Sequence, residues 1–265
     1  MNTGLGETDK FSDISTPVIL ISGPTASGKS NLALELAEFI KGEIINIDSV
    51  QVYKYLDIGS AKPTKEQMSK VRHHGIDILE PNEICNAEKI RDMVFSAVTN
   101  ITKRGKIPIL VGSSGMYITA LFSKFSKFPK RDDAIRTELE NRDASDLYDE
   151  LKLKDPHRAS QLHVNDKNRI VRALEILYLS DKSIGELSEE LMPTLKGLML
   201  VVTHKREELY KRINLRTKKI IEDGLLEETK NLINKYGIGI PTLRSVGYSE
   251  ALEAIQGNIN IEELE

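Results

Sequence analysis

Eight residues near the start of the chain have the types and spacing that hold a phosphate group. The segment Gly23-Pro24-Thr25-Ala26-Ser27-Gly28-Lys29-Ser30 fits the pattern Gly-x4-Gly-Lys-Ser. Its glycines permit a tight loop whose backbone N–H groups converge on an anion, and a helix expected to begin near Ser30 adds its positive dipole end. Lys29 can reach phosphate oxygens, and Ser30 offers a hydroxyl to Mg²⁺. The pattern predicts a phosphate site without identifying the phosphate compound or the bond that breaks.

A second candidate group stands at the end of another apolar run, where the sequence reads Asp48-Ser49-Val50-Gln51. The carboxyl ends of parallel strands border the ligand crevice of an open α/β sheet, so we expect Asp48 close to the phosphate loop. Asp48 could hold Mg²⁺ through water or accept a proton from an attacking nucleophile. It could equally be a capping or turn aspartate. Position alone leaves these alternatives open.

Two further segments are less informative. A third apolar run ends in Gly112-Ser113-Ser114, whose small residues and hydroxyls would let a ligand approach the backbone, although a plain strand-to-helix turn would look similar. His73 and His74 are adjacent, so they cannot share a helix face and make a poor metal site. We expect them in a loop or in packing.

One arginine pair opens a helix expected over Asp166–Ser180. Arg169 and Arg172 are three residues apart and share a face, which suits contacts to phosphate or bases. Glu175 follows Arg172 by three residues, so the same face could instead carry intrahelical ion pairs.

A second pair lies in a basic strip near the end of the chain. Arg212 and Arg216 are four residues apart, within a stretch of seven Lys or Arg and two Glu over 205–219. Such strips are commonly solvated helix faces. This strip follows the last expected strand, however, so it starts at the same rim as the phosphate loop.

The elements that must position these groups are four short apolar runs without strict alternation, as expected for parallel strands covered on both faces. They are Pro17–Ser22, Glu43–Asp48, Ile107–Gly112 and Leu198–Thr203. Helical patterns alternate with them, which predicts an α/β core formed by 1–124 and 197–265. Residues 125–196 are charged and predict a helical insertion domain, and the tail is predicted helical with breaks near Gly224, Gly237 and Gly247.

Composition sets wider limits. The chain has 265 residues and a net charge of −3, which gives no overall attraction to nucleic acid but does not exclude a local basic face. Cys85 is the single cysteine, so no intramolecular disulfide is possible and a reducing compartment is favoured. Met1–Thr16 lacks the features of a secretory signal and is expected to be frayed. We expect a cytoplasmic protein with no membrane span.

Taken together, these motifs resemble those of the tRNA dimethylallyltransferases, also called tRNA isopentenyltransferases. The most specific are Asp-Ser-x-Gln at 48–51, Gly-x-Ala-Lys-Pro at 59–63 and Asn-Asp-x-x-Arg-x-x-Arg-Ala-Leu-Glu at 165–175. The resemblance also includes His73–Asp77, Val111–Tyr117, Arg206–Arg216 and Gly247-Tyr248, and so spans nearly the whole chain.

The resemblance implies a fold and a reaction. The fold is a P-loop core with a parallel sheet, like that of nucleotide kinases, with the helical insertion contacting tRNA. The reaction moves a dimethylallyl group from dimethylallyl diphosphate to N6 of the adenosine immediately 3′ of a tRNA anticodon, with Mg²⁺ and without ATP. Diphosphate leaves, and the target base must leave its stack to react. A monomer is expected.

The same resemblance implies roles for individual residues. Asp48, Ser114 and Arg216 are expected to be catalytic, with Asp48 taking the N6 proton and Arg216 neutralising the leaving diphosphate. Gly23–Ser30 is expected to hold the diphosphate, with Ser30 on the metal. The residues expected to contact tRNA are Asp48, Ser49, Val50, Gln51, Ser114, Arg136, Asn168, Arg169, Ile170, Val171 and Arg172.

Two departures and two alternatives accompany this reading. The family usually has Gly-Gly-Thr where this chain has Gly112-Ser113-Ser114, and its members usually continue past Glu265 into a basic helix. We therefore expect a short or truncated member that lacks some tRNA affinity. The alternatives are a P-loop small-molecule kinase, which would release ADP from ATP, and an RNA-binding module without catalysis. The presence of Lys29, Asp48 and Ser114 argues against the module.

Overall fold

A computed structural model describes residues 17–122, 128–180, 182–187, 194–260 and 264 of the chain. The N-terminal segment Met1–Thr16, expected to be frayed, lies outside the described residues. The chain divides into two compact units, one formed by 1–122 and 195–265 and the other by 123–194. The predicted junctions, after residues 124 and 196, each lie two residues later than these. The first of them falls within 123–127, which is not described.

The first unit is built on a five-stranded sheet in which every pairing is parallel. Its order is β3-β2-β4-β1-β5. The strands are β1 (Val18–Ser22), β2 (Glu43–Asn46), β3 (His73–His74), β4 (Pro108–Val111) and β5 (Gly197–Val201). The chain leaves β1 toward one edge and reaches the other edge with β5, so a topological switch point lies beside β1, where α/β sheets bind ligands.

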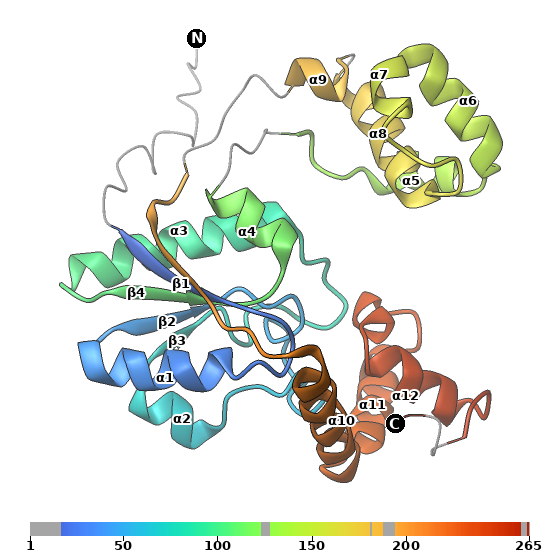
Figure 1. Cartoon of the computed structure of the whole chain (residues 1–265). Coiled ribbons are helices and arrows are strands. Elements are labelled where there is room, and N and C mark those ends of the chain that lie inside the picture. Colours follow the sequence, from blue (N-terminus) through green and yellow to red (C-terminus); the bar gives the residue numbers. More distant parts are fainter. Residues whose placement is uncertain (1–16, 123–127, 181, 188–193, 261–263, 265) are drawn as a thin grey trace. The chain divides into compact units, whose positions relative to one another are not determined.

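Helices cover both faces of this sheet, as Figure 1 shows. On one face, α1 (Lys29–Ile40) packs against Ile21, Ile44 and Ile109, and α2 (Lys65–Lys70) lies on the same side. On the other, α3 (Ala87–Lys103) and α4 (Gly115–Phe122) enclose a larger core with Leu20 and its neighbours. Alternate residues of a strand point to opposite faces of the sheet. Since helices cover both faces, both sets of side chains are apolar, which accounts for the continuous apolar runs of the sequence.

One strand differs from expectation. The fourth apolar run was predicted to be buried, but β5 forms an edge of the sheet, and Leu198, Met199 and Val201 are 59%, 49% and 58% exposed. The apolar composition predicts that this run is a strand, but it does not indicate whether the strand lies at an edge of the sheet. His73 and His74 were predicted to lie in a loop or in packing; the loop alternative was wrong, because they form the short opposite edge strand, pair with Ile44 and Ile45 and are partly buried.

The remainder of the first unit is helical: α10 (Arg206–Glu222), α11 (Leu225–Tyr236), a 3₁₀ turn η2 (Pro241–Arg244) and α12 (Tyr248–Ile255). Gly224 precedes α11, Gly237 ends it, and Gly247 precedes α12, each with a positive φ. The predicted helix breaks are therefore confirmed, because glycine adopts this left-handed backbone without a Cβ penalty.

The second unit contains helices only, among its described residues. They are α5 (Asp133–Glu140), α6 (Ala144–Lys154), α7 (Pro156–Ala159), α8 (Lys167–Ser180) and α9 (Ile184–Leu187). Its core is formed by residues such as Leu147, Leu151, Ile170 and Leu174, which are fully buried. The amphipathic helix predicted over Asp166–Ser180 is confirmed. Among the helices of the part of the chain that the structure describes, none is long and apolar enough to cross a membrane.

Candidate functional site

The phosphate-loop sequence adopts the backbone that its glycines allow. Gly23 has a φ of 150°, and a Cβ there would lie 2.4 Å from the Val202 carbonyl oxygen, so a larger residue would push the loop away from the end of β5. Gly28 has a φ of 91° and is the N-cap of α1. Ala26 also has a positive φ, of 61°, which is unusual without glycine and fits a tightly constrained loop.

Two features leave donors of this loop available to an anion. The first turn of α1 has neither a side-chain cap nor an acidic residue. The positive end of the helix dipole is therefore not neutralised by a side chain of that turn. Ser27 is only 2% exposed, and its hydroxyl has no hydrogen-bond partner within the described residues. A buried polar group without a partner is costly, and a bound phosphate oxygen would relieve that cost.

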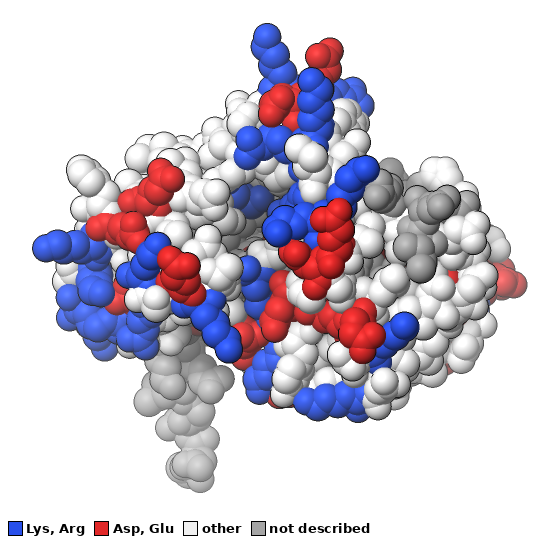
Figure 2. Space-filling model, turned by 90° about the horizontal axis from the view of Figure 1, so that it is seen from below, with Lys and Arg blue, Asp and Glu red and all other residues white. Residues whose placement is uncertain are grey.

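A cleft of about 680 Å³ opens over the loop. Five cationic side chains contribute to its lining: Lys29, Lys62, Arg212, Arg216 and Lys219. Figure 2, viewed from below Figure 1, shows Lys and Arg side chains gathered around a hollow in this face. A cleft with several cations and apolar walls concentrates polyanionic ligands, although the protein carries a net negative charge.

The long helix α10 is bound directly to the phosphate loop. Arg212 donates from Nε to the Ala26 carbonyl at 2.8 Å. Just before the helix, the His204 ring nitrogen Nε2 lies 2.8 Å from the Ser27 carbonyl. These two contacts hold the loop from its carbonyl side. The basic strip is therefore more than a solvated helix face at Arg212 and Arg216.

Asp48 lies among these cations. Burial lowers the pKa of Lys29 and of Arg216, and in both cases the charge of Asp48 opposes that effect. Its Oδ1 also accepts the N–H groups of Val50 and Gln51, at 2.8 and 3.2 Å. Asp48 thus closes a turn, as one alternative proposed, and its charge acts on Lys29 and Arg216; a role toward Mg²⁺ or as proton acceptor stays a prediction.

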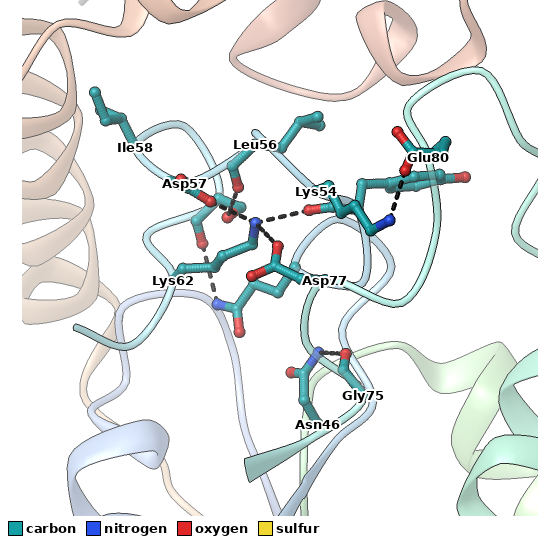
Figure 3. A network of polar contacts seen from close by, with 12 residues as sticks. Asn46, Lys54, Leu56, Asp57, Ile58, Lys62, Gly75, Asp77 and Glu80 are labelled. Atoms are coloured by element: carbon teal, nitrogen blue, oxygen red, sulfur yellow. Dashed lines mark hydrogen bonds and ion pairs between the residues drawn. The ribbon is translucent and has the colours of Figure 1, made fainter. Parts of the chain in front are cut away.

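The segment after Asp48 also contributes to the lining of the cleft, through Gln51, Ala61 and Lys62. Gln51 donates from Nε2 to the Ser60 and Ala61 carbonyls at 3.1 and 3.3 Å. Figure 3 shows Lys62 at the centre of this segment, where its ammonium group contacts the carboxylates of Asp57 and Asp77, both at 2.5 Å, and the carbonyl of Tyr53 at 2.7 Å. The Lys62 side chain is 6% exposed, which makes it a buried cross-link.

The end of β4 is tightly packed. A Cβ on Gly112 would lie 2.6 Å from a side-chain atom of Ile47, so glycine is required there. Ser113 is exposed, and the Ser114 carbonyl accepts the first N–H bond of α4, from Ile118 at 3.0 Å. Burial, with the charge of Asp48 contributing, raises the pKa of Tyr117. The charge of Asp48 therefore acts on Tyr117 of α4.

The residues predicted to contact tRNA in the second unit have different environments. Asn168 and Arg169 are exposed, whereas Ile170 and Val171 are fully buried in the helical core. Arg172 donates to the Pro129 carbonyl and to Glu175, each at 2.8 Å. The side chains of 170 and 171 pack the unit, and the tRNA contacts expected from this helix stay predictions.

Arg136 shares that carboxylate, since it lies 3.4 Å from the fully buried Glu175. Glu175 also accepts the Asp132 N–H at 2.8 Å, so it ties α5 to α8. The ion-pair alternative for this helix face is thus confirmed for Arg172.

Sequence reasoning missed the contacts that join distant segments. Arg212 was noted only as part of a basic pair, and Lys62 only as part of a motif. Glu228 was not singled out, although it accepts three backbone N–H groups from 57–59. The signals present were the Arg-x-x-x-Arg spacing and the Gly-x-Ala-Lys-Pro motif, but neither identifies its partner.

A parallel sheet with this loop and a cation-lined cleft defines a P-loop α/β protein. Comparison with known proteins is more specific. The model of the IPP transferase family matches residues 51–265. The tRNA dimethylallyltransferase 1 of Citrifermentans bemidjiense is 41% identical over 250 residues, which cover 93% of this chain and 82% of that protein. The tRNA dimethylallyltransferase of Thermotoga neapolitana is 40% identical over 92% of the chain and 82% of its own length.

Solved structures agree. A tRNA delta(2)-isopentenylpyrophosphate transferase from Staphylococcus epidermidis matches with a TM-score of 0.65 and 31% identity, over 94% of this chain and 84% of that one. A eukaryotic dimethylallyltransferase acting on tRNA matches with a TM-score of 0.81 and 30% identity, over 94% and 66%. The chain therefore belongs to the IPP transferase family, and the P-loop fold class predicted from the sequence is confirmed.

Proposed function

We propose that this protein transfers a dimethylallyl group from dimethylallyl diphosphate to N6 of the adenosine immediately 3′ of the anticodon in tRNA. The observation that carries the proposal is the meeting of an intact phosphate loop with Lys29, Arg212 and Arg216 at one cleft, in a chain of this family. The loop would hold diphosphate as the leaving group of a carbon transfer.

The chemistry suits the groups around the cleft. The N6 amine attacks C1 of the donor, the C1–O bond breaks, and diphosphate leaves with the bonding electrons. Cations and N–H donors that neutralise the leaving group lower the barrier, which assigns the Gly23–Ser30 loop, Lys29 and Arg216 to that end of the reaction. The N6 proton passes to Asp48, which also orients the amine. Ser114 would lie near the adenine.

Mg²⁺ is the proposed cofactor. Among the described residues, no group of three or more His, Cys, Asp or Glu could form a metal cage. Mg²⁺ commonly binds through one or two protein oxygens together with substrate phosphates and water, so the Ser30 hydroxyl and the Asp48 carboxylate fit that pattern. When bound, the metal would add positive charge beside the diphosphate.

The tRNA would be held by both units. In the first unit, Asp48–Gln51 borders the cleft; in the second, Arg136 and Asn168–Arg172 are proposed contacts, of which Asn168 and Arg169 are exposed. The target base would have to leave its stack to reach the loop, as other base-modifying enzymes require. The predicted monomeric state and cytoplasmic location stay proposals.

The test is incubation with labelled dimethylallyl diphosphate and unmodified tRNA, followed by nucleoside analysis. We expect label on the adenosine 3′ of the anticodon, and none on a tRNA with guanosine at that position. Lys29→Gln should abolish transfer, whereas Lys41→Gln, at the exposed other end of the same helix, should not.

Two further assays separate the remaining alternatives. With ATP and a small-molecule acceptor, release of ADP without label transfer to tRNA would mean a kinase, which the comparisons do not favour. Salt-dependent tRNA binding without turnover would mean an RNA-binding module.

A further inference from the structure

Glu228 occupies an unusual position in the first turn of α11. Its Oε2 accepts the backbone N–H groups of Asp57 and Ile58, both at 2.8 Å. Its Oε1 accepts the N–H of Gly59 at 3.0 Å and the hydroxyl of Tyr248 at 2.6 Å. One carboxylate therefore accepts hydrogen bonds from three consecutive peptide N–H groups and one side-chain hydroxyl. Hydrogen bonds to a carboxylate are charge-assisted and stronger than those between neutral groups.

The segment that Glu228 holds, Asp57–Ala61, is here called the 57–61 turn. It is closed internally by Ala61 N–H donating to the Ile58 carbonyl at 2.9 Å. Its later carbonyls face the catalytic cleft: the Ser60 carbonyl accepts from Gln51 at 3.1 Å and from Arg216 at 3.4 Å. The same turn thus meets Glu228 through its N–H groups and two cleft residues through its carbonyls.

The packing behind the turn leaves little freedom. Tyr248 is fully buried, and a Cβ on Gly59 would lie 2.5 Å from its ring. The segments that contain Lys54 and Glu80 are bound to the same helix. The Tyr236 hydroxyl, at the end of α11, donates to Glu80 at 2.6 Å, and Glu80 pairs with Lys54 at 2.5 Å. Figure 3 shows the Lys54–Glu80 pair beside the Lys62 cluster. The loop is anchored at both ends of α11.

We propose that Glu228 is a positioning residue, which holds the 57–61 turn so that Gln51 and Arg216 are aimed into the cleft. It touches neither reacting group. The inference rests on the proposed function, because it assigns the C-terminal helices the task of orienting the catalytic wall. A displacement of the turn by about 1 Å would misplace both side chains, and errors of that size can cost about 100-fold in rate.

Glu228→Gln tests this with little change in shape. Glutamine presents one oxygen and one NH₂ group, so two of the four donors would face another donor. We expect kcat for tRNA prenylation to fall about 10- to 100-fold. The affinity for inorganic diphosphate should fall much less than kcat, because the phosphate loop and Lys29 are untouched and Arg216 is the one diphosphate-binding group that the turn holds.

Two variants provide controls. Glu227→Gln alters the preceding, exposed glutamate of the same helical turn and should leave kcat unchanged. Glu228→Asp restores a carboxylate and should recover part of the lost kcat. An unchanged kcat in Glu228→Gln, or equal losses in both Gln variants, would overturn the proposal. So would a fall in thermal stability without any fall in kcat per folded molecule.

A measurement on the wild-type protein remains decisive if Glu228→Gln does not fold. The amide hydrogens of 57–59 should exchange slowly with solvent, although they lie in a turn, because all three are bound to Glu228. Rapid exchange would refute the arrangement. If the wild-type enzyme transfers no label to tRNA, the proposed function fails, and the exchange result still stands on its own.

Discussion

Replacing Asp48 by asparagine separates its role in the turn from its proposed role as the base. Asparagine keeps a side-chain oxygen that can accept the Val50 and Gln51 N–H groups, so the turn at the end of β2 should survive. It removes the charge and the basic oxygen. If Asp48 takes the N6 proton, Asp48→Asn should therefore retain the fold and lose the chemistry.

The two effects differ in size. Loss of a general base costs about 10²- to 10⁴-fold in rate, or about 3–5 kcal/mol in the barrier. The turn loses only the charge-assisted part of two hydrogen bonds, about 1 kcal/mol together. For a protein of this size that lowers the melting temperature by about 2–4 °C. The carboxylate also raises the pKa of Lys29 and Arg216, so both pKa values should fall in the variant.

The assay is single-turnover prenyl transfer with enzyme in excess over tRNA, alongside thermal unfolding and tRNA binding. Binding should be close to wild type. Asp48→Ala, which removes the turn acceptor as well, should unfold at a lower temperature than Asp48→Asn at a similar transfer rate. A near-normal single-turnover rate in Asp48→Asn would refute the assignment of Asp48 as the base.

Three further predictions concern stability and tRNA binding. Gly59→Ala should cost about 1–3 kcal/mol of unfolding free energy, because its Cβ would meet a buried tyrosine ring, whereas Gly239→Ala, with open space around it, should not; thermal unfolding compares them. Burial alone would raise the pKa of Glu43, but hydrogen bonds from its arginine, histidine and lysine partners lower it to about 2. The stabilisation that the Glu43 carboxylate contributes is thus complete above its ordinary pKa of 4.5 and is lost as the pH falls toward 2. In denaturant titrations over that pH interval, the unfolding free energy of wild type should fall by about 2–3 kcal/mol more than that of Glu43→Gln. Arg169→Ala should weaken tRNA binding, with a salt slope lower by about 1, at unchanged melting temperature, whereas Arg172→Ala should also destabilise the helical unit; an unchanged slope would exclude Arg169 from phosphate contact.

The sequence by itself determined the features that depend on local chemistry. The glycine and lysine spacing of Gly23–Ser30 specified a phosphate loop, because a tight anion-binding turn needs those residue types in that order. Apolar runs specified the strands β1, β2 and β4, and glycines marked the ends of the C-terminal helices. Motif combinations identified the family, since Gly-x-Ala-Lys-Pro is informative even when its mechanical role is unknown.

Only the tertiary structure decided which segments meet. Leu198 and its neighbours look like a core strand because apolar composition does not report sheet order, and the topology places β5 at an edge. The capping of 57–59 by Glu228 joins residues about 170 positions apart, and Arg212 reaches Ala26 over 186. Hydrogen bonds across such separations leave no periodic trace in a sequence, because their geometry exists only after the chain has folded.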